Sequence, residues 1–480
     1  MMDFWAISIE IAITVLLLLT LLVDLALPKE SDRRLVAFIT VIGLVSVFVF
    51  SLGQYHLSPS ETFYLGLFIA DNYSLFFKQL FILGMVFVVL FSLEYTHKFI
   101  RYRGEFYSLL LSALLGMCVM ASANDFITLF VGLELMTISF YILVGFRMDE
   151  AESSEAAVKY LLVGSGSTAV MLYGVSLIYG AAGSLDFLTI CRNIHLFYAA
   201  GLAGVVLIMA GFFFKLSAIP FHMWAPDVYQ GAPTPVTALL AMSSKAAGLA
   251  VFMRVLYVAF PILGTYWMTL LAVASALSMI GGNIMAMKQT DVKRMLAYSS
   301  IAQAGYMLAA MASADYAGIK AVMFYATLYL FANVGAFAVL SVVEEERGGT
   351  THAHLTGLSE ASPMLAAVMT VSLVSMAGVP PTAGFAGKIY IFTAAVDYGY
   401  VWLAFVGFIM SMMSIYYYLL VVRAMYRDLE QQETDAARPI APPFSVRLTA
   451  LLSTAATLVV GVWPEFLARA TNLASQTFMR

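Results

Sequence analysis

Long apolar segments follow one another along almost the whole of this chain. A helix needs roughly 20 apolar residues to cross a bilayer, and about fourteen segments meet that measure. They are residues 4–27, 34–56, 73–96, 106–122, 125–146, 153–181, 201–230, 235–258, 264–286, 295–312, 317–343, 362–395, 399–424 and 446–468. Because every backbone polar group must be paired inside hydrocarbon, segments of this length cross a membrane only as helices. The sequence therefore predicts an all-α polytopic membrane protein.

Composition narrows the possible functions. Hydrophobic residues make up 62% of the chain and charged residues 11%, whereas about a quarter of the residues in a soluble domain are charged. The net charge of -4 and the lack of a basic run give no sign of nucleic-acid binding. The sequence contains no P-loop, no GxGxxG, no CxxC and no haem-like histidine pair. We expect no redox cofactor, nucleotide or metal site in this chain.

Proline interrupts two of the segments, and each of the two also contains a lysine. The residues are Lys215 and Pro220 in GFFFKLSAIPFHMW, and Pro380, Pro381 and Lys388 in SMAGVPPTAGFAGKIYIF. Proline breaks a helix because it lacks an N–H and clashes with the preceding turn. A straight helix over residues 362–395 would be roughly 50 Å long, against a hydrocarbon core of about 30 Å. We expect two broken helices beside buried charge, which is typical of ion or proton pathways.

The two interrupted segments are the seventh and the twelfth along the chain. An odd number of crossings separates them, so they cross the membrane in opposite directions, as in an inverted-topology repeat. We predict an inverted five-helix repeat and divide the chain accordingly. The parts are residues 1–105 with three segments, 106–258 as the first repeat, 259–424 as the second repeat, and 425–480 with a polar loop and the last segment.

The basic residues set the expected orientation. Most lysines and arginines outside the segments lie in the connections that follow odd-numbered segments. By the positive-inside rule these connections face the cytoplasm, which leaves both termini outside. The long polar connection, residues 423–447, is then a cytoplasmic loop.

Glu134 is a carboxylate near the middle of residues 125–146. A carboxylate in hydrocarbon tends to protonate unless a cation is close, and Lys215 is its natural partner. Lys215 also lies beside the carbonyl of Leu216, which Pro220 leaves unpaired and which could accept from the ammonium or hold a water molecule. We interpret Glu134 either as an electrostatic gate on a proton path or as half of a structural ion pair.

Further groups could move protons. Lys245 lies in mid-segment among small residues that leave room for water, and Lys388 follows the double proline between two glycines. Lys159 lies seven residues into its segment, and either Lys159 or Lys245 could be a relay or could reach the membrane surface. His222 follows the first break and suits a proton wire, although a lone histidine is more often structural. Two lysines near segment ends are expected to reach the surface: Lys78 and Lys320.

Three stretches indicate a family. KLSAIPFHMWAPDVYQGAPTPVTALLAMSSKAAG resembles the most characteristic segment of the antiporter-like subunits of respiratory complex I and of the Mrp-type cation/proton antiporters. DVKRMLAYSSIAQAGYML is similar to a second family segment, in which members often carry a histidine where Gln303 stands. GVPPTAGFAGKIYIF is similar to the N-type subunits of complex I. M-type subunits typically have glutamate in place of Lys388, whereas D-type Mrp subunits also have lysine.

The resemblance implies a proton-pumping unit in the membrane arm of complex I, in a bacterial inner membrane. The roles it implies are a gating pair, a central lysine, an exit-side lysine and two associated groups: Glu134 with Lys215, then Lys245, Lys388, and Lys159 with His222. The implied partners are other membrane-arm subunits, including neighbouring antiporter-like subunits, with lipids and protons. NADH, FMN, iron–sulfur clusters and quinone would belong to other subunits. The alternatives are an Mrp-type Na⁺/H⁺ antiporter subunit and a purely structural membrane scaffold.

Overall fold

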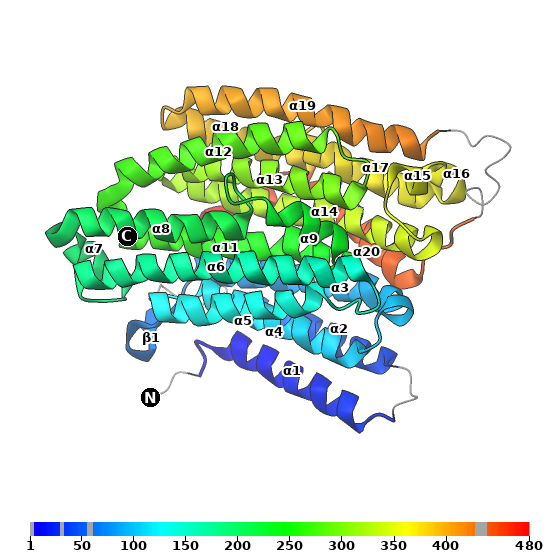
Figure 1. The fold of residues 1–480 in the computed structure, drawn as a ribbon, viewed down its shortest axis with the longest axis horizontal. Coiled ribbons are helices and arrows are strands. Elements are labelled where there is room, and N and C mark those ends of the chain that lie inside the picture. Colours follow the sequence, from blue (N-terminus) through cyan, green and yellow to red (C-terminus); the bar gives the residue numbers. More distant parts are fainter. Residues whose placement is uncertain (1–3, 29–32, 55–60, 428–438, 480) are drawn as a thin grey trace.

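The structure is a computed structural model that describes residues 4–28, 33–54, 61–427 and 439–479. Long helices run side by side along one axis, and both ends of the described chain lie on the same side of the bundle (Figure 1). The long helices are α1 (Ser8–Ala26), α2 (Arg34–Leu52), α3 (Asn72–Phe99), α4 (Arg103–Ala121), α5 (Phe126–Val144), α6 (Ala151–Ala182), α8 (Tyr198–Leu216), α12 (Gly264–Ala286), α13 (Val292–Met311), α14 (Tyr316–Arg347), α19 (Val401–Met425) and α20 (Phe444–Val462).

Shorter elements complete or connect these helices. They are β1 (Glu61–Phe63), β2 (Phe68–Ala70), α7 (Phe187–Asn193), α9 (Trp224–Gly231), α10 (Thr234–Ala241), α11 (Ser243–Arg254), α15 (His352–Leu355), α16 (Leu358–Ala361), α17 (Pro363–Ala377), α18 (Ala383–Asp397) and α21 (Glu465–Ser475). The strands β1 and β2 form a small antiparallel hairpin. Part of the polar loop expected at residues 423–447, namely residues 428–438, lies outside the described residues.

The expected all-α membrane architecture is confirmed. Within the described residues, 12 helices are long and apolar enough to cross a membrane. Helix α13 and the broken pair α17–α18 bring the total to the number expected from the sequence. The division of these helices into two inverted repeats stays a prediction.

Both predicted helix breaks are present. Helix α8 ends at Leu216 and α9 starts at Trp224, and Ser217 between them has a left-handed backbone with φ 56°. Helix α17 ends at Ala377 and α18 starts at Ala383. In each case a proline lies in the connecting turn, as expected from its missing N–H.

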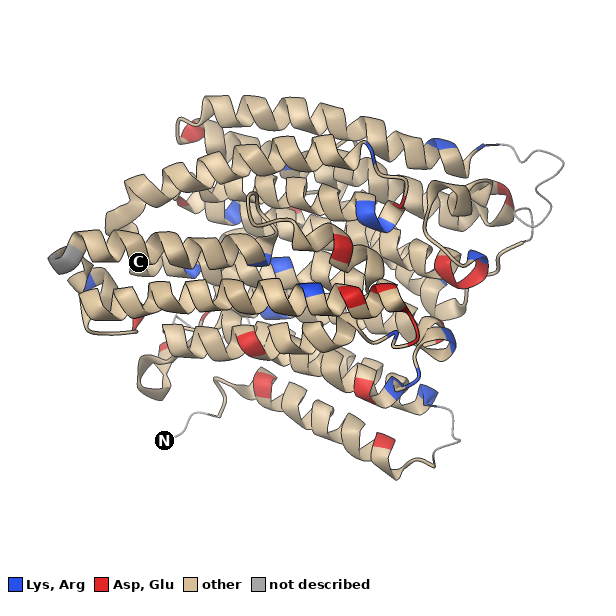
Figure 2. Cartoon of the chain, viewed as in Figure 1, with Lys and Arg blue, Asp and Glu red and all other residues tan. Residues whose placement is uncertain are grey.

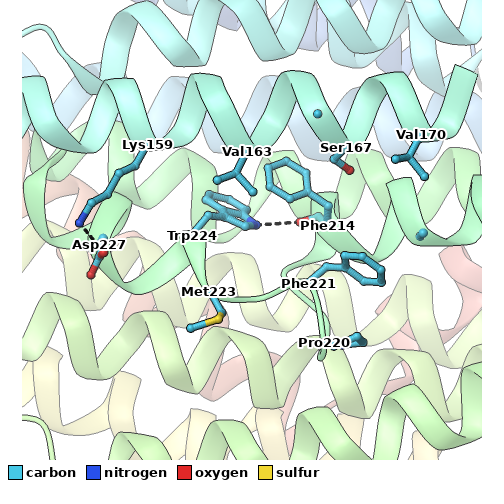
Figure 3. Close-up of a pocket in the computed structure, with 12 residues that line it drawn as sticks. Lys159, Val163, Ser167, Val170, Phe214, Pro220, Phe221, Met223, Trp224 and Asp227 are labelled. Carbon is cyan, nitrogen blue, oxygen red and sulfur yellow. Dashed lines mark hydrogen bonds and ion pairs between the residues drawn. The ribbon is translucent and has the colours of Figure 1, made fainter.

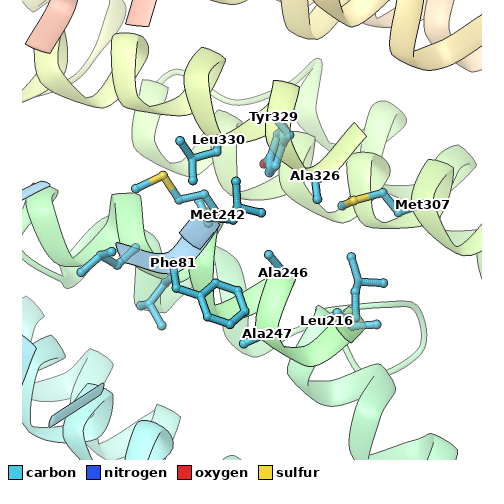
Figure 4. Close-up of a cluster of buried hydrophobic side chains, with 14 of the residues drawn as sticks. Phe81, Leu216, Met242, Ala246, Ala247, Met307, Ala326, Tyr329 and Leu330 are labelled. Carbon is cyan, nitrogen blue, oxygen red and sulfur yellow. The ribbon is translucent and has the colours of Figure 1, made fainter. Parts of the chain in front are cut away.

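A third interruption was not expected from the sequence. Helices α10 and α11 meet at Met242, where the backbone is distorted to φ -110° and ψ -71° although helical hydrogen bonds continue on both sides of it. No proline marks this position. Met242 lies in the buried hydrophobic cluster with Phe81 and Leu330 (Figure 4). Lys245 follows this position by three residues. Lys215, Lys245 and Lys388 therefore all lie close to an irregular point of their helix.

Inner and outer helices differ sharply in burial. The apolar part of α14 is 94% buried inside the protein and that of α3 is 83% buried, against 22% for α6 and 28% for α1 and α20. The outer helices expose apolar side chains, which is stable in contact with lipid tails. Figure 2 shows most charged residues near the ends of the bundle, with a small number inside it.

Aspartate side chains start several of the helices. In five of them the carboxylate accepts a backbone N–H of the first turn, which replaces a partner that a helix N-terminus lacks. These residues are Asp71 before α3, Asp125 before α5, Asp186 before α7, Asp291 before α13 and Asp315 before α14. The caps place the helix starts, and therefore the side chains two to three turns further on, at defined depths.

Candidate functional site

Three lysines are buried in the middle of the bundle. Lys215 on α8 is 4% exposed, Lys245 on α11 is 1% exposed, and Lys388 on α18 is 3% exposed. They belong to three different crossings, and each lies within about two turns of a helix interruption. An ammonium at such a depth must find acceptors inside the protein.

Lys215 bonds to a threonine and not to the expected groups. Its Nζ donates to Thr137 Oγ1 at 2.6 Å. Glu134, one turn earlier on α5, is half-buried and accepts from Thr168 Oγ1 of α6 at 3.1 Å. The ion pairs of the described residues do not include one between Glu134 and Lys215. Lys215 therefore turns toward α5 and does not use the carbonyl of Leu216, and a water held by that carbonyl stays a prediction.

A small cavity of about 10 Å³ lies beside Lys215 and beside Thr168, the partner of Glu134. Thr137, Thr168 and Lys215 line it, together with apolar side chains of α5, α6 and α8. About one water molecule needs a space of this size and two or more polar partners. The site can therefore connect Glu134 to Lys215 through threonine hydroxyls and a single water.

Lys245 is held by a single residue of α13. Its Nζ donates to the backbone oxygen of Ser300 at 2.9 Å and to the Ser300 hydroxyl at 2.8 Å. The same hydroxyl donates to the carbonyl of Ala297 at 2.7 Å. Ser300 therefore provides Lys245 with neutral oxygen acceptors only.

Lys388 uses a carbonyl that the double proline leaves unpaired. Its Nζ donates to the backbone oxygen of Ala377 at 2.8 Å and to Ser411 Oγ of α19 at 2.7 Å. In a continuous helix the carbonyl of Ala377 would accept from the residue four positions later, which is Pro381 and has no N–H. The face of the Tyr306 ring lies 4.7 Å from the ammonium. Here the freed carbonyl does hold the lysine.

Polar groups continue from Lys245 toward Lys388 along α13. Gln303, one turn after Ser300, donates to the backbone oxygen of Met376 at 3.1 Å and to the Tyr418 hydroxyl at 3.3 Å. Tyr325 donates to its amide oxygen at 2.5 Å. Met376 directly precedes the carbonyl that binds Lys388. Gln303 therefore joins the surroundings of the two lysines, although its amide cannot titrate.

Lys159 and His222 lie nearer the surface than the three lysines. The Lys159 side chain is 45% exposed and pairs with Glu155 of its own helix and with Asp227 of α9, each at 2.8 Å. Arg294 of α13 bonds the other oxygen of Asp227 at 2.8 Å. His222 is half-buried in the turn before α9. Figure 3 shows Lys159 and Asp227 at one end of a pocket that is otherwise lined mainly by apolar side chains, about 420 Å³ in volume.

The buried lysines of the described residues fall into two groups, those that lie near a carboxylate partner and those that do not form an ion pair. Lys78 does not reach the surface as expected: it is buried and pairs with Glu10 of α1 at 2.7 Å. Lys293 lies 3.8 Å from Glu344, which also pairs with Arg147 at 2.5 Å. The described ion pairs do not include Lys215, Lys245 or Lys388.

Several residues of the site have no clear signal in the sequence. Thr137 could have been found, because it lies three residues after Glu134 and so on the same helix face. Ser300 and Ser411 come from helices far along the chain from their lysines. The partners that only the structure reveals are Thr168, Asp227, Ser300 and Ser411.

The sequence matches a protein family over the same part of the chain. Residues 123–414 match the profile described as the membrane region of NADH:quinone oxidoreductase and Mrp antiporters. This range contains all three central lysines, the breaks and Glu134. The chain belongs to this family.

Two curated relatives of this chain are of the same subunit type. It is 46% identical over 477 residues to NADH-quinone oxidoreductase subunit N of Heliobacterium modesticaldum, covering 99% of this chain and 100% of the relative. It is 45% identical to the subunit N of Desulforamulus reducens, with 99% of each chain covered. These identities, over whole chains, confirm the N-type resemblance and make the chain a homologue of a complex I membrane-arm subunit.

Solved structures share the fold. A chain of respiratory complex I from Thermus thermophilus with bound aureothin superposes with a TM-score of 0.82 at 33% identity, covering 97% of this chain and 99% of that one. A chain of the Mrp complex from Dietzia superposes with a TM-score of 0.87 at 19% identity, covering 98% and 97%. The second likeness concerns the fold alone.

Proposed function

We propose that this chain translocates protons as an N-type subunit of a NADH-quinone oxidoreductase, driven by quinone reduction in other subunits. The observation that carries the proposal is that Lys215, Lys245 and Lys388 are buried and that, within the described part of the chain, their hydrogen bonds go to neutral oxygens. Burial disfavours the charged form of a group, and an opposite charge nearby restores it. A lysine that has no fixed counter-ion can therefore gain or lose its proton when neighbouring charges change.

Glu134 and Lys215 are the proposed gate. Two unit charges 4 Å apart interact by about 4 kcal/mol at an effective dielectric near 20, which is enough to change the protonation of a lysine. In the structure Lys215 is bonded to Thr137 and Glu134 to Thr168. A movement of either side chain toward the other would form the ion pair, and the reverse movement would break it. The gate therefore needs only side-chain movement.

Lys245 is the proposed central relay, and Lys388 the proposed exchange site toward the exit. Gln303 and its tyrosine partners would bind the water that connects them. Lys159 and His222 take supporting roles, because Lys159 is exposed and fixed by carboxylates. The second helix break contributes directly, since Pro381 cannot donate to the carbonyl of Ala377 and so leaves it free to hold Lys388.

The proposal includes location and partners. The chain would lie in a bacterial cytoplasmic membrane with both termini outside, as the distribution of basic residues predicts. Neighbouring antiporter-like subunits would contact its lipid-facing helices. NADH, FMN, iron–sulfur clusters and quinone would be bound by other subunits.

The decisive experiment removes the central relay. The complex with Lys245→Met is reconstituted into vesicles, and acidification of the lumen is measured per quinone reduced. We expect at least roughly a tenfold loss, because a positioned proton-transfer group is removed. Lys320→Met is the matched control, since Lys320 lies near the start of α14, above the Tyr390 ring. Normal pumping by an assembled Lys245→Met complex would refute the proposal, and a requirement for Na⁺ would favour the antiporter alternative.

A further inference from the structure

An apolar groove opens beside α6 where the first helix break interrupts the wall of the bundle. Its volume is about 420 Å³, and the side chains that line it on α6 lie opposite those of α8, the turn and α9 (Figure 3). They include Val163, Gly166 and Val170 on one side and Phe214, Phe221 and Trp224 on the other. The indole N–H of Trp224 donates to the backbone oxygen of Phe214 at 2.9 Å, so this ring offers the groove its apolar surface.

The groove lies at the depth of one leaflet of the membrane. Helix α6 has 32 residues, so it is roughly 48 Å long and, when centred, extends about 9 Å beyond a hydrocarbon core of about 30 Å at each end. Lys159 lies about 12 Å from the start of α6 and therefore close to the boundary of the core. From Lys159 to Val170 the helix rises by about 16 Å, which is close to half of the core.

A charged cavity continues the groove at its outer end. The cavity has a volume of about 190 Å³ and shares Lys159 and Asp227 with the groove. Three carboxylates and two cations line it, which gives a net charge of -1: Glu152, Glu155 and Asp227 with Lys159 and Arg294. A polar cavity that carries both signs of charge and joins an apolar groove is complementary to an amphiphile with a zwitterionic head.

We propose that the groove and the cavity bind one molecule of phosphatidylethanolamine, with an acyl chain along α6 and the headgroup among the charged residues. Arg294 donates to Asp227 and to Gln230 through Nη1, at 2.8 and 3.0 Å. A guanidinium has five N–H donors, so Arg294 also has the capacity to donate to a phosphate. Glu152 and Glu155 are exposed on α6 and provide acceptors for the ammonium.

The charge of the cavity selects among phospholipids. Membrane proteins bind anionic headgroups in basic pockets, whereas this cavity has one carboxylate in excess. A primary ammonium compensates that excess and donates three hydrogen bonds, which the methylated ammonium of a choline headgroup does not. The positive-inside rule places this end of α6 in the leaflet that faces the cytoplasm.

Gly166 and Gly180 provide a matched pair of variants for the first test. Both lie on α6, about four turns apart, and a Cβ built on either has no atom within 4 Å. Gly166 lines the groove and Gly180 does not. The complete complex is placed in lipid discs with equal amounts of phosphatidylethanolamine and phosphatidylglycerol, and its structure is determined by cryo-electron microscopy.

We expect chain-like density from the level of Lys159 to that of Val170 in the native complex and in Gly180→Leu, and its loss in Gly166→Leu. An empty groove in the native complex, or a helix of a neighbouring subunit in the groove, would overturn the proposal.

The second test identifies the headgroup. The native and Gly166→Leu complexes are washed free of bulk lipid, and the lipids that remain bound are quantified by mass spectrometry. The native complex should retain one more phosphatidylethanolamine than the variant. No difference, or a difference in phosphatidylglycerol, would contradict the assignment.

Charge variants then test the selectivity. Changing Glu152→Gln together with Glu155→Gln turns the net charge of the cavity from -1 to +1. An exposed ion pair changes binding by up to about fivefold, so the ratio of phosphatidylethanolamine to phosphatidylglycerol at this site should fall roughly five- to twentyfold. The matched control is Glu345→Gln with Glu346→Gln, at the same end of the bundle, because the preceding Glu344 pairs with Arg147 just before α6. Equal ratios in the two double variants would refute the headgroup contacts. These measurements do not involve pumping, so the lipid site and the proposed function can fail separately.

Discussion

Replacing Gly378 by alanine tests how closely the second helix break is fitted to its lysine. Gly378 ends α17 in the left-handed region, with φ 82° and ψ 41°. A Cβ at this position would lie 2.7 Å from Cδ and 3.2 Å from Nζ of Lys388. Real Cβ atoms do not approach other atoms so closely, so the lysine must move. Its ammonium would then leave the carbonyl of Ala377 or the hydroxyl of Ser411.

Two contributions to the cost can be separated. Left-handed backbone costs an alanine about 1–2 kcal/mol relative to glycine. Loss of one hydrogen bond by a charged group costs about 1.5–3 kcal/mol more. Gly183, the glycine that ends α6, has φ 69° and no atom within 4 Å of a built Cβ. Gly183→Ala therefore carries the first cost without the second. This second cost lowers the fraction of molecules in which the Lys388 ammonium keeps its native position by roughly ten- to a hundredfold.

The assay compares the two variants in the purified complex. Subunit content reports assembly, and acidification of vesicles per quinone reduced reports pumping. We expect both variants to assemble, Gly183→Ala to pump like the native complex, and Gly378→Ala to pump at least roughly tenfold less. Equal pumping by the two variants would refute the reasoning, because it would mean that the position of the Lys388 ammonium does not matter.

Three further predictions concern charged residues. Lys388→Met and Lys388→Arg should both impair pumping in vesicles, with Arg no better than Met, because a guanidinium does not release its proton at useful pH. Full pumping by the Arg variant would mean that Lys388 serves only as a fixed positive charge. Glu134→Ala should strongly reduce pumping at normal subunit content and Glu134→Asp should be milder, and normal acidification by the assembled Ala variant would contradict the gate. Glu10→Gln should lower the amount of folded subunit, because leaving the buried Lys78 unpaired costs about 3–5 kcal/mol. A second change, Lys78→Met, should restore that amount. Unchanged thermal stability of Glu10→Gln would show that the ion pair is not needed.

Local sequence signals account for the elements but not for all of their interruptions. Apolar runs of sufficient length gave the membrane helices, because in hydrocarbon only a helix pairs its own backbone. Proline gave the breaks near Pro220 and Pro381, because a missing N–H acts wherever the residue stands. Met242 has no such property, and the sequence gives no signal for the distortion there, in a segment that packs against α3 and α14.

The sequence by itself placed Lys215, Lys245 and Lys388 within apolar segments and near breaks or small residues, so their depth in the membrane could be predicted from it. Only the tertiary structure decided what each of them bonds to. Thr137, Ser300 and Ser411 lie 78, 55 and 23 residues from their lysines along the chain. The same holds for Lys78, whose carboxylate partner Glu10 turns a residue expected at the surface into a buried ion pair. A helix sequence fixes the depth of a side chain, since depth follows from the rise per residue, whereas the neighbour it meets depends on the rotation and packing of a second helix.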